Sequence, residues 1–199
     1  MIKNIVLDVG GVLFDDSKAN LRRIIGMEHD AVMKRAYSDE FKARLLGIQT
    51  LEGQFETMYQ DPDFDIIYKL LAAEYLPETY PVFAENLEYV RGLKEAGYRL
   101  FLLTNITEES HKYIDSVMGI DSLFDGGIYS YLEKVVKPDP EIYRLLIERF
   151  GLEKSETIFF DDREKNVVAA REFGIQAEVF KTIDDIKQAL ERNSGAKEK

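Results

Sequence analysis

Residues 2–16 read IKNIVLDVGGVLFDD, and the fold can be worked out from this stretch. Residues 5–7 form an apolar run that stops at Asp8, and the glycines Gly10 and Gly11 follow. A short apolar run bounded by glycines is typical of a strand that is buried on both faces of a parallel sheet. Asp8 is therefore expected at the carboxyl end of a central strand, where open α/β sheets bind their ligands.

The composition of the chain limits its size class and its partners. With 199 residues, of which 45% are hydrophobic, it suits one domain or one domain with an insert. A net charge of -11 argues against nucleic acid and anionic membranes as partners, because both favour lysine and arginine. The absence of cysteine excludes thiolate metal sites, and two histidines make a multi-histidine site unexpected. No apolar run approaches the ~20 residues that span a bilayer. The N-terminus shows no signal-peptide pattern, so a cytoplasmic protein is expected.

After the first strand the chain alternates between predicted strands and predicted helices. Apolar runs predict strands at residues 99–103, 127–132, 157–160 and 177–180, and amphipathic segments predict the helices between them. This alternation indicates an α/β fold with a doubly wound parallel sheet. Right-handed crossovers then place the carboxyl ends of all these strands at one edge of the sheet.

One long segment interrupts this pattern directly after the first strand. It is rich in charged and aromatic residues at helical spacing and contains no convincing strand. Ser17, Ser38 and Thr50 are expected to cap the N-termini of three helices, and residues 66–71 mark a fourth. The segment is therefore predicted to be a small helical unit.

This pattern divides the chain into a core and an insert. We expect residues 1–15 and 82–199 to form the core domain and residues 16–81 to form a helical cap. Because the chain enters the predicted cap shortly after Asp8, we interpret the cap as a lid over the site that contains Asp8. The alternative is a helical bundle with no part in the chemistry.

Polar residues follow the predicted strands at the edge where their carboxyl ends meet. Carboxylates that lie close together repel one another, and Mg²⁺, which prefers carboxylate, water and phosphate oxygens, relieves that repulsion. A carboxylate can also act as a nucleophile and form an aspartyl-phosphate, while a lysine and a hydroxyl group stabilise the charge of a phosphoryl group. Phosphoryl transfer is the chemistry that this set favours. The set comprises Asp8, Thr104, Asn105, Lys137, Asp161 and Asp162.

The order of these motifs resembles the haloacid dehalogenase-like (HAD) hydrolase superfamily. The motifs are DVGGVL at residues 8–13, LTN at 103–105, KPDPEIY at 137–143 and FFDD at 159–162. Each motif alone is weak, but four in the right order are a specific signal, and the resemblance covers essentially the whole chain. It implies a HAD-like, Rossmann-like core, and the helical insert resembles the first type of cap in this superfamily.

The resemblance implies the catalytic roles of five residues. Asp8 would be the nucleophile, and Lys137 would bind the phosphoryl group and orient Asp8. Thr104, Asn105 and Gly11 would contact the phosphoryl group. The implied activity is a Mg²⁺-dependent phosphatase that acts on a small phosphorylated metabolite, with a sugar phosphate as one possibility.

The resemblance also implies how the Mg²⁺ ion is held. Asp8 and Asp162 would be the main carboxylate ligands, Gly10 would contribute its backbone carbonyl, and Asp161 would lie next to the metal. The branch that contains glucose-1-phosphate phosphatases is the most similar in pattern, because its members share a DD pair followed by asparagine, here Asn166.

The sequence departs from the superfamily at Gly10. Phosphatases of this superfamily usually carry an aspartate at that position, which serves as general acid and base. Without it we expect a preference for substrates with good leaving groups. Asp15 and Asp16 are interpreted as a turn and a helix cap, and Asp15 or a residue of the cap is the first candidate for a replacement acid.

Two other functions remain open at the level of sequence. A metal-independent haloacid dehalogenase would use Asp8 to attack carbon, and a catalytically weak HAD protein would bind phosphate in a regulatory role. The DD pair and Lys137 favour the phosphatase. His111 is expected to be a solvated helix residue, and His29 is either structural or directed at the substrate. Neither the substrate nor the choice between monomer and dimer follows from the sequence.

Overall fold

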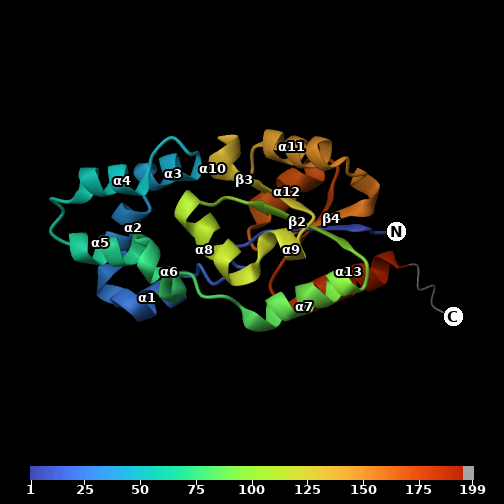
Figure 1. Ribbon diagram of the computed structural model, residues 1–199, viewed down its shortest axis with the longest axis horizontal. Coiled ribbons are helices and arrows are strands. Elements are labelled where there is room, and N and C mark those ends of the chain that lie inside the picture. Colours follow the sequence, from blue (N-terminus) through green and yellow to red (C-terminus); the bar gives the residue numbers. More distant parts are fainter. Residues whose placement is uncertain (195–199) are drawn as a thin grey trace.

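The computed structural model describes residues 1–194 and contains a five-stranded parallel sheet with the order β3-β2-β1-β4-β5 (Figure 1). The central strand β1 pairs with both β2 and β4, so the predicted doubly wound parallel sheet is confirmed. The strands are β1 (Asn4–Leu7), β2 (Arg99–Thr104), β3 (Gly126–Tyr129), β4 (Thr157–Asp161) and β5 (Gln176–Val179).

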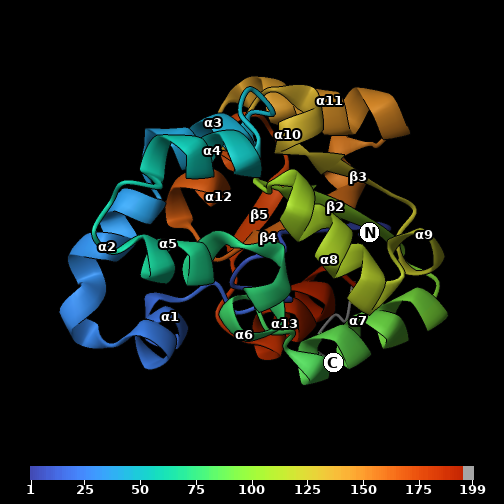
Figure 2. The same cartoon turned by 60° about the vertical axis from the view of Figure 1, so that its left-hand side comes forward.

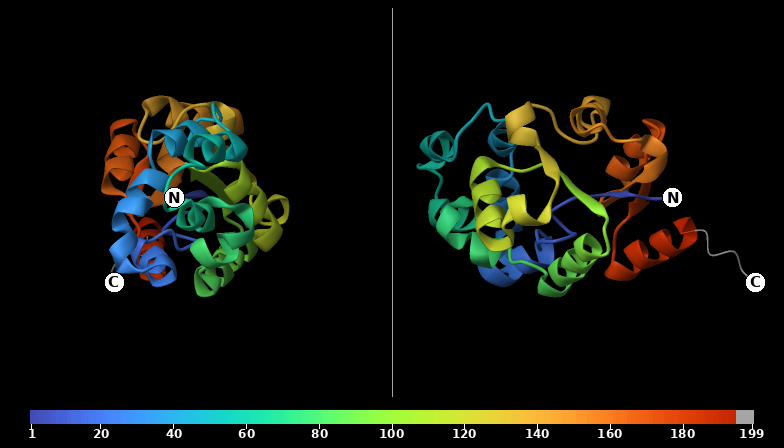
Figure 3. Two further views of the ribbon diagram at one scale, coloured as in Figure 1. Left: turned by 90° about the vertical axis from the view of Figure 1, so that its left-hand side faces the viewer. Right: turned by 45° about the vertical axis from the view of Figure 1, so that its right-hand side comes forward.

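Helices cover both faces of this sheet because successive side chains of each strand point to opposite faces. Ile5 and Leu7 of β1 pack in one apolar cluster with residues of α7, α8 and α13, and Val6 packs in a second cluster with residues of α11 and α12. Figure 3 (right) shows α7 and α13 on one side of β1. The core helices are α7 (Ala84–Glu95), α8 (Glu108–Met118), α9 (Ile120–Leu123), α10 (Ser130–Glu133), α11 (Pro140–Phe150), η3 (Lys154–Glu156), α12 (Glu164–Glu172) and α13 (Ile183–Asn193).

The segment between β1 and β2 begins as a group of helices that lies at one end of the molecule (Figure 1). It has an apolar cluster of its own, which includes Leu21, Val32 and Ile67. Its division from the core at residues 15/16 and 81/82 stays a prediction, and residues 195–199 of the predicted core lie outside the described residues. The cap helices are α1 (Lys18–Ile25), η1 (Met27–His29), α2 (Asp30–Ala36), α3 (Asp39–Leu45), α4 (Leu51–Met58), α5 (Phe64–Leu71), η2 (Ala73–Tyr75) and α6 (Leu76–Thr79).

The expected N-caps of the insert differ in outcome. Ser17 Oγ accepts a hydrogen bond from Asn20 N (3.2 Å), and Thr50 Oγ1 accepts one from Gly53 N (3.0 Å), as predicted. Ser38 precedes α3, but its hydroxyl bonds to the Glu40 carboxylate and makes no backbone cap. Ser38 is therefore the N-cap residue as predicted, but its hydroxyl accepts no hydrogen bond from the backbone of α3.

The predicted strand at residues 127–132 was wrong in its second half. β3 ends at Tyr129, and the chain turns into the short helix α10. Ser130 is buried there, and its hydroxyl accepts a hydrogen bond from Ile106 N (3.0 Å). This contact with the loop after β2 holds the turn, which apolar periodicity could not indicate.

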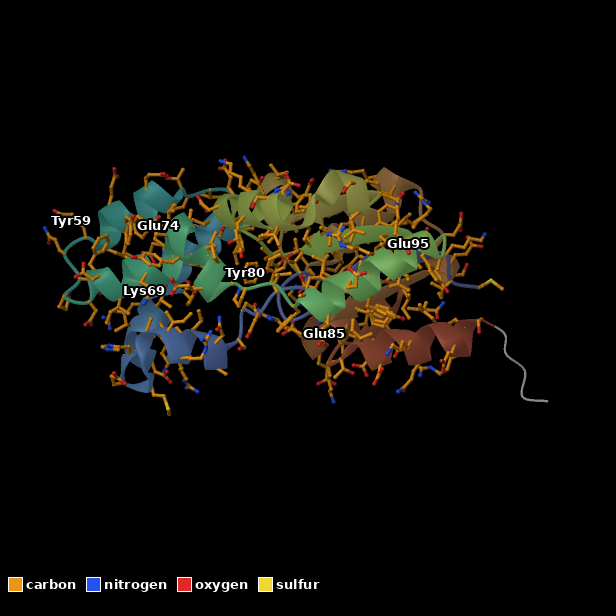
Figure 4. The ribbon with its side chains drawn as sticks, turned by 60° about the horizontal axis from the view of Figure 1, so that its bottom comes forward. Tyr59, Lys69, Glu74, Tyr80, Glu85 and Glu95 are labelled. Carbon is orange, nitrogen blue, oxygen red and sulfur yellow. The ribbon has the colours of Figure 1, made fainter. Side chains whose placement is uncertain are left out.

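The two chain segments that join cap and core run side by side. Asp15 N donates to Pro81 O (2.9 Å), and Phe83 N donates to Leu13 O (2.8 Å). Figure 4 shows Tyr80 where the ribbon passes from the cap helices towards α7. Among the helices of residues 1–194, none is both long and apolar enough to cross a membrane.

Candidate active site

The carboxyl end of β1 meets a buried lysine. Asp8 follows β1, and Lys137 reaches it from the loop before α11, with Lys137 Nζ 2.8 Å from Asp8 Oδ2. The same Nζ lies 2.6 Å from Asp161 Oδ2 at the end of β4 and donates to Leu103 O at 2.7 Å. Because Lys137 is only 2% exposed, these contacts fix its charge between two carboxylates.

Asn105 positions the loop that carries Lys137. Asn105 Oδ1 accepts a hydrogen bond from Lys137 N (2.7 Å), and Asn105 Nδ2 donates to Lys137 O (3.0 Å). Both polar atoms of the side chain are therefore engaged, and we expect any phosphoryl contact of Asn105 to come from its backbone. Thr104 is buried at the end of β2, the strand beside β1.

The two carboxylates of the DD pair have different surroundings. Asp161 is fully buried, and its oxygens accept hydrogen bonds from Asn166 Nδ2 (2.9 and 3.0 Å) and Arg163 N (2.8 Å). The side chain of Asp162 is 31% exposed. Asp162 is thus the better placed of the two to bind a ligand, and Asp161 serves to hold Lys137 and Asn166.

Asp8, Asp161 and Asp162 form a carboxylate cluster that could hold a metal ion. One oxygen of each lies within 4.8 Å of the others. Three close carboxylates fit a hard divalent cation such as Mg²⁺. In addition, Asn166 Oδ1 is buried without a hydrogen-bond partner among the described residues. A water molecule of a hydrated cation would supply such a partner, so the residues present fit the ion.

Burial sets the protonation of this cluster. It raises the pKa of Asp8 to about 8, although the positive charge of Lys137 opposes the shift. It also raises the pKa of Asp162 to about 6, with a further contribution from the charge of Asp16. Burial acts on Asp161 in the same direction, but the charge and hydrogen bond of Lys137, together with the hydrogen bond from Arg163 N, lower its pKa. A cation at the cluster would favour the ionised form of Asp8 and Asp162.

Asp15 and Asp16 make different contacts, although they are neighbours in the sequence. Asp15 Oδ1 accepts a hydrogen bond from Ser17 N (2.9 Å), which is the predicted turn. Asp16 caps no helix, because Ser17 caps α1. Its carboxylate lies over Gly10 instead, and a Cβ atom placed on Gly10 would be 2.7 Å from Asp16 Oδ2. Sequence spacing gave no signal for this contact.

A cavity of about 560 Å³ lies above this edge, between core and cap. Asp8, Gly10 and Lys137 line it from the core, and Asp16 and Arg163 also face it. The cap contributes mainly apolar and aromatic side chains, among them Met33, Tyr37, Phe41, Leu45 and Leu70. The structure thus joins the carboxylate cluster to a space that is large enough for a small molecule.

Neither His29 nor His111 is among the residues that line the cavity. His111 was expected in solvent, but its ring stacks on Tyr129 with 3.8 Å between ring centroids, and its Nδ1 lies 2.9 Å from Tyr131 Oη. That expectation was wrong because Tyr129 and Tyr131 come from a distant part of the sequence. His29 Nε2 lies 3.7 Å from Glu28 Oε1 in η1.

A family model described as a haloacid dehalogenase-like hydrolase matches residues 2–174. The phosphorylated carbohydrates phosphatase of Thermotoga maritima is 24% identical over 201 residues, which cover 96% of this chain and 92% of that protein. The sesquiterpene phosphatase of Aspergillus oryzae is 34% identical over 92 residues, which cover 46% of this chain and 47% of that protein. Acyl-CoA dehydrogenase family member 10 of Mus musculus is 33% identical over 109 residues, 54% of this chain and only 10% of that protein. The chain thus spans less than half the length of these last two relatives.

Two crystal structures of a HAD family enzyme from Bacteroides thetaiotaomicron share the fold. The magnesium complex has a TM-score of 0.74 at 24% identity and covers 95% of this chain and 98% of that chain. The complex with magnesium and inorganic phosphate has a TM-score of 0.70 at 24% identity, and the match covers 90% of this chain and 94% of that chain.

Proposed function

The chain belongs to the haloacid dehalogenase-like hydrolase family, and we propose that within it this hydrolase is a Mg²⁺-dependent phosphatase for a small phosphorylated metabolite. The observation that carries the proposal is the buried Lys137 Nζ between Asp8 and Asp161, at the floor of the cavity. A fixed positive charge beside a carboxylate nucleophile suits phosphoryl transfer, which depends on positioning and on stabilising the charge of the phosphoryl oxygens.

In this proposal Asp8 is the nucleophile. Its Oδ1 accepts a hydrogen bond from Val9 N (2.7 Å) and its Oδ2 contacts Lys137, so the carboxylate is oriented before a substrate binds. Attack of an Asp8 oxygen on phosphorus forms an aspartyl-phosphate, and water then hydrolyses it. Lys137 and the backbone at Gly11 and Asn105 contact the phosphoryl group and offset its charge.

The proposed metal ligands are the side chains of Asp8 and Asp162 and the carbonyl of Gly10, with Asp161 as their neighbour. When bound there, Mg²⁺ would supply positive charge to the phosphoryl oxygens and to the nucleophile. Support comes from the crystallised relative that holds magnesium and inorganic phosphate, and from the relatives that are named as phosphatases. A sugar phosphate, as in the glucose-1-phosphate phosphatases, stays one candidate within the substrate class.

A turnover screen tests this function. Release of inorganic phosphate is measured from 4-nitrophenyl phosphate and from a panel of sugar phosphates, with Mg²⁺ and with a chelator, and halide release is measured from 2-chloropropanoate. We expect phosphate release that needs Mg²⁺ and disappears in Asp8→Asn. Halide release without metal would support the dehalogenase instead, and phosphate binding without turnover would support the regulatory alternative.

A further inference from the structure

Gly10 is a glycine at a position where the backbone does not require one. Its φ is not among the positive values that favour glycine, unlike that of Gly11 at 69°. A side chain at residue 10 would instead meet a neighbouring carboxylate, which would have to move. A Cβ atom there would lie 2.7 Å from Asp16 Oδ2, which is closer than real Cβ contacts, and 3.1 Å from Asp16 Cγ. The space of the missing side chain is therefore occupied by the carboxylate of Asp16.

The backbone between these two residues explains how Asp16 reaches that space. The N–H groups of Leu13 and Phe14 donate to Val9 O (2.8 and 3.0 Å), and Gly11 N donates to Phe14 O (2.8 Å). These bonds close a tight loop that brings the chain back over Gly10. The pairing of Asp15 with Pro81 then directs the chain into the cap.

Asp16 is accessible to a bound substrate. Its side chain is 35% exposed, and it lines the same cavity as Asp8 and Lys137. Arg163 Nη2 lies 3.4 Å from Asp16 Oδ2, but the Arg163 side chain is 54% exposed. An exposed ion pair of this kind contributes little to stability. Pairing with Arg163 alone therefore does not explain why a carboxylate fills the space above Gly10.

We propose that Asp16 is the general acid and base of the reaction, in place of the aspartate that Gly10 lacks. This inference rests on the proposed phosphatase function. It replaces the expectation, drawn from Gly10 alone, that the enzyme has no positioned acid. It also assigns Gly10 a role, because any side chain there would displace the Asp16 carboxylate.

The two steps of the reaction balance with Asp16 in this role. In the first step an Asp8 oxygen bonds to phosphorus, the bond from phosphorus to the ester oxygen breaks, and the proton of the Asp16 carboxyl group moves to that oxygen. In the second step the Asp16 carboxylate removes a proton from water as the water oxygen bonds to phosphorus. The bond from phosphorus to Asp8 breaks, which releases inorganic phosphate and restores both side chains.

The test compares leaving groups of graded pKa. Values of kcat/KM are measured with Mg²⁺ for aryl phosphates, from 4-nitrophenyl to phenyl phosphate, and for primary alkyl phosphates. For the wild type we expect a shallow dependence on leaving-group pKa. For Asp16→Asn we expect a loss of ~10²–10⁴-fold with the alkyl esters, the usual contribution of a general acid. The loss in this first step should be small with 4-nitrophenyl phosphate, whose leaving group needs no proton.

Asp15→Asn is the matched control. It makes the same chemical change one residue earlier and keeps the oxygen that accepts the hydrogen bond from Ser17 N. For Asp15→Asn we expect the kcat/KM values of the wild type and the same dependence of kcat/KM on leaving-group pKa. The double variant Gly10→Asp with Asp16→Ala places a carboxyl group from residue 10 in the space that Asp16 vacates. It should restore the shallow dependence of kcat/KM on leaving-group pKa that Asp16→Asn loses.

Three results would overturn the proposal. One is an Asp16→Asn variant whose kcat/KM depends on leaving-group pKa as in the wild type. A variant whose kcat/KM falls by the same factor for every ester would count in the same way, because a purely structural role of Asp16 would produce either result. Another is a steep slope in Tyr80→Phe but not in Asp16→Asn, since Tyr80 Oη approaches the same point, 3.4 Å from a Cβ atom on Gly10. The third is a wild type that hydrolyses no phosphate ester, which would overturn the phosphatase function as well. The first two leave that function intact.

Discussion

The core and the cap both contain apolar clusters, but they place their charged groups differently. In the core, Lys137 and Asp161 form an ion pair whose side chains are 1% and 0% exposed. In the cap, Arg22 and Asp30 pair with side chains that are 38% and 44% exposed. A buried charge is unfavourable unless it is paired, whereas an exposed pair has little effect on stability. The buried pair in the core is therefore costly unless its charges have a use, which is consistent with the proposed active site, whereas the exposed pair in the cap needs no such explanation.

Arg44 is the exception in the cap, and it marks where cap and core meet. It is 3% exposed, donates to Gln54 Oε1 within the cap at 2.8 Å, and donates to Glu109 Oε2 of the core helix α8 at 2.8 Å. Figure 2 shows its helix α3 beside the core helix α10. The comparison thus separates three groups of charged residues: buried ones at the proposed active site, exposed ones, and a buried contact between the two regions.

The largest effect should come from the nucleophile. Asp8→Asn should abolish phosphate release, because an amide cannot form the acyl phosphate, and the variant should remain folded. The measurement is kcat with Mg²⁺, together with the free energy of unfolding. Asp39→Asn in the cap removes a carboxylate that is 90% exposed, and we expect no change from it. A near-normal kcat in folded Asp8→Asn would remove Asp8 from its proposed role.

Lys137 should show the next largest effect, on both activity and stability. Lys137→Met should lower kcat by ~10²–10³-fold, the range for losing one fixed electrostatic partner of the transition state. It should also lower the free energy of unfolding by ~3–5 kcal/mol, because Asp8 and Asp161 remain buried without their counter-charge.

Lys134→Met is the matched control for Lys137→Met. Lys134 lies three residues earlier and is exposed, so the same change there should leave both quantities close to those of the wild type. Equal losses of kcat and of unfolding free energy in Lys137→Met and Lys134→Met would show that the burial of Lys137 does not cause the effect of its substitution.

Asp162→Asn should stabilise the metal-free protein. The pKa of Asp162 is raised from 3.8 to about 6, so its ionised form is disfavoured in the folded state. The wild type is therefore expected to lose stability relative to the variant as the pH rises from about 4 to 6, with a constant difference above that range. Denaturation with a chelator across pH 4–8 measures this. Mg²⁺ should then stabilise the wild type more than the variant, and equal stabilisation of both would argue against Asp162 as a ligand.

The contact between cap and core should give the smallest effect. Burial raises the pKa of Glu109, but the hydrogen bond and charge of Arg44 outweigh it, so the pKa is lowered. Its contribution to stability is then complete above the ordinary glutamate pKa of 4.5 and is lost as the pH falls through the lowered value. Glu109→Gln keeps a hydrogen-bond acceptor for the buried Arg44 but removes its counter-charge, so we expect it to destabilise by ~1–3 kcal/mol at pH 7. The difference should shrink below pH 4.5 and vanish once the pH falls below the lowered pKa of Glu109.

The position of the cap is the remaining test of this contact. If the cap is a lid, solution scattering should show a more variable arrangement for Glu109→Gln than for the wild type, and a more uniform one with inorganic phosphate and Mg²⁺. One invariant arrangement in all these states would contradict the lid.

The sequence by itself determined the sheet and the residues that meet at its edge. Apolar runs ending at Asp8, Asn105 and Asp161 are a local signal, and the topology of a parallel sheet brings strand ends together whatever the loops do. Lys137 was found in the same way, from its place before a helix on that edge. The predicted strand at residues 127–132 failed in part because its end is set by a contact with another loop.

Only the tertiary structure decided what the loop residues do. Asp16 covers Gly10 because the hydrogen bonds to Val9 O fold the chain back, and no pattern of hydrophobicity encodes that path. Asn105 holds the Lys137 loop for a similar reason. The physical distinction is between burial, which repeats along a strand or helix and can be read from the sequence, and the meeting of particular side chains, which depends on where the backbone turns.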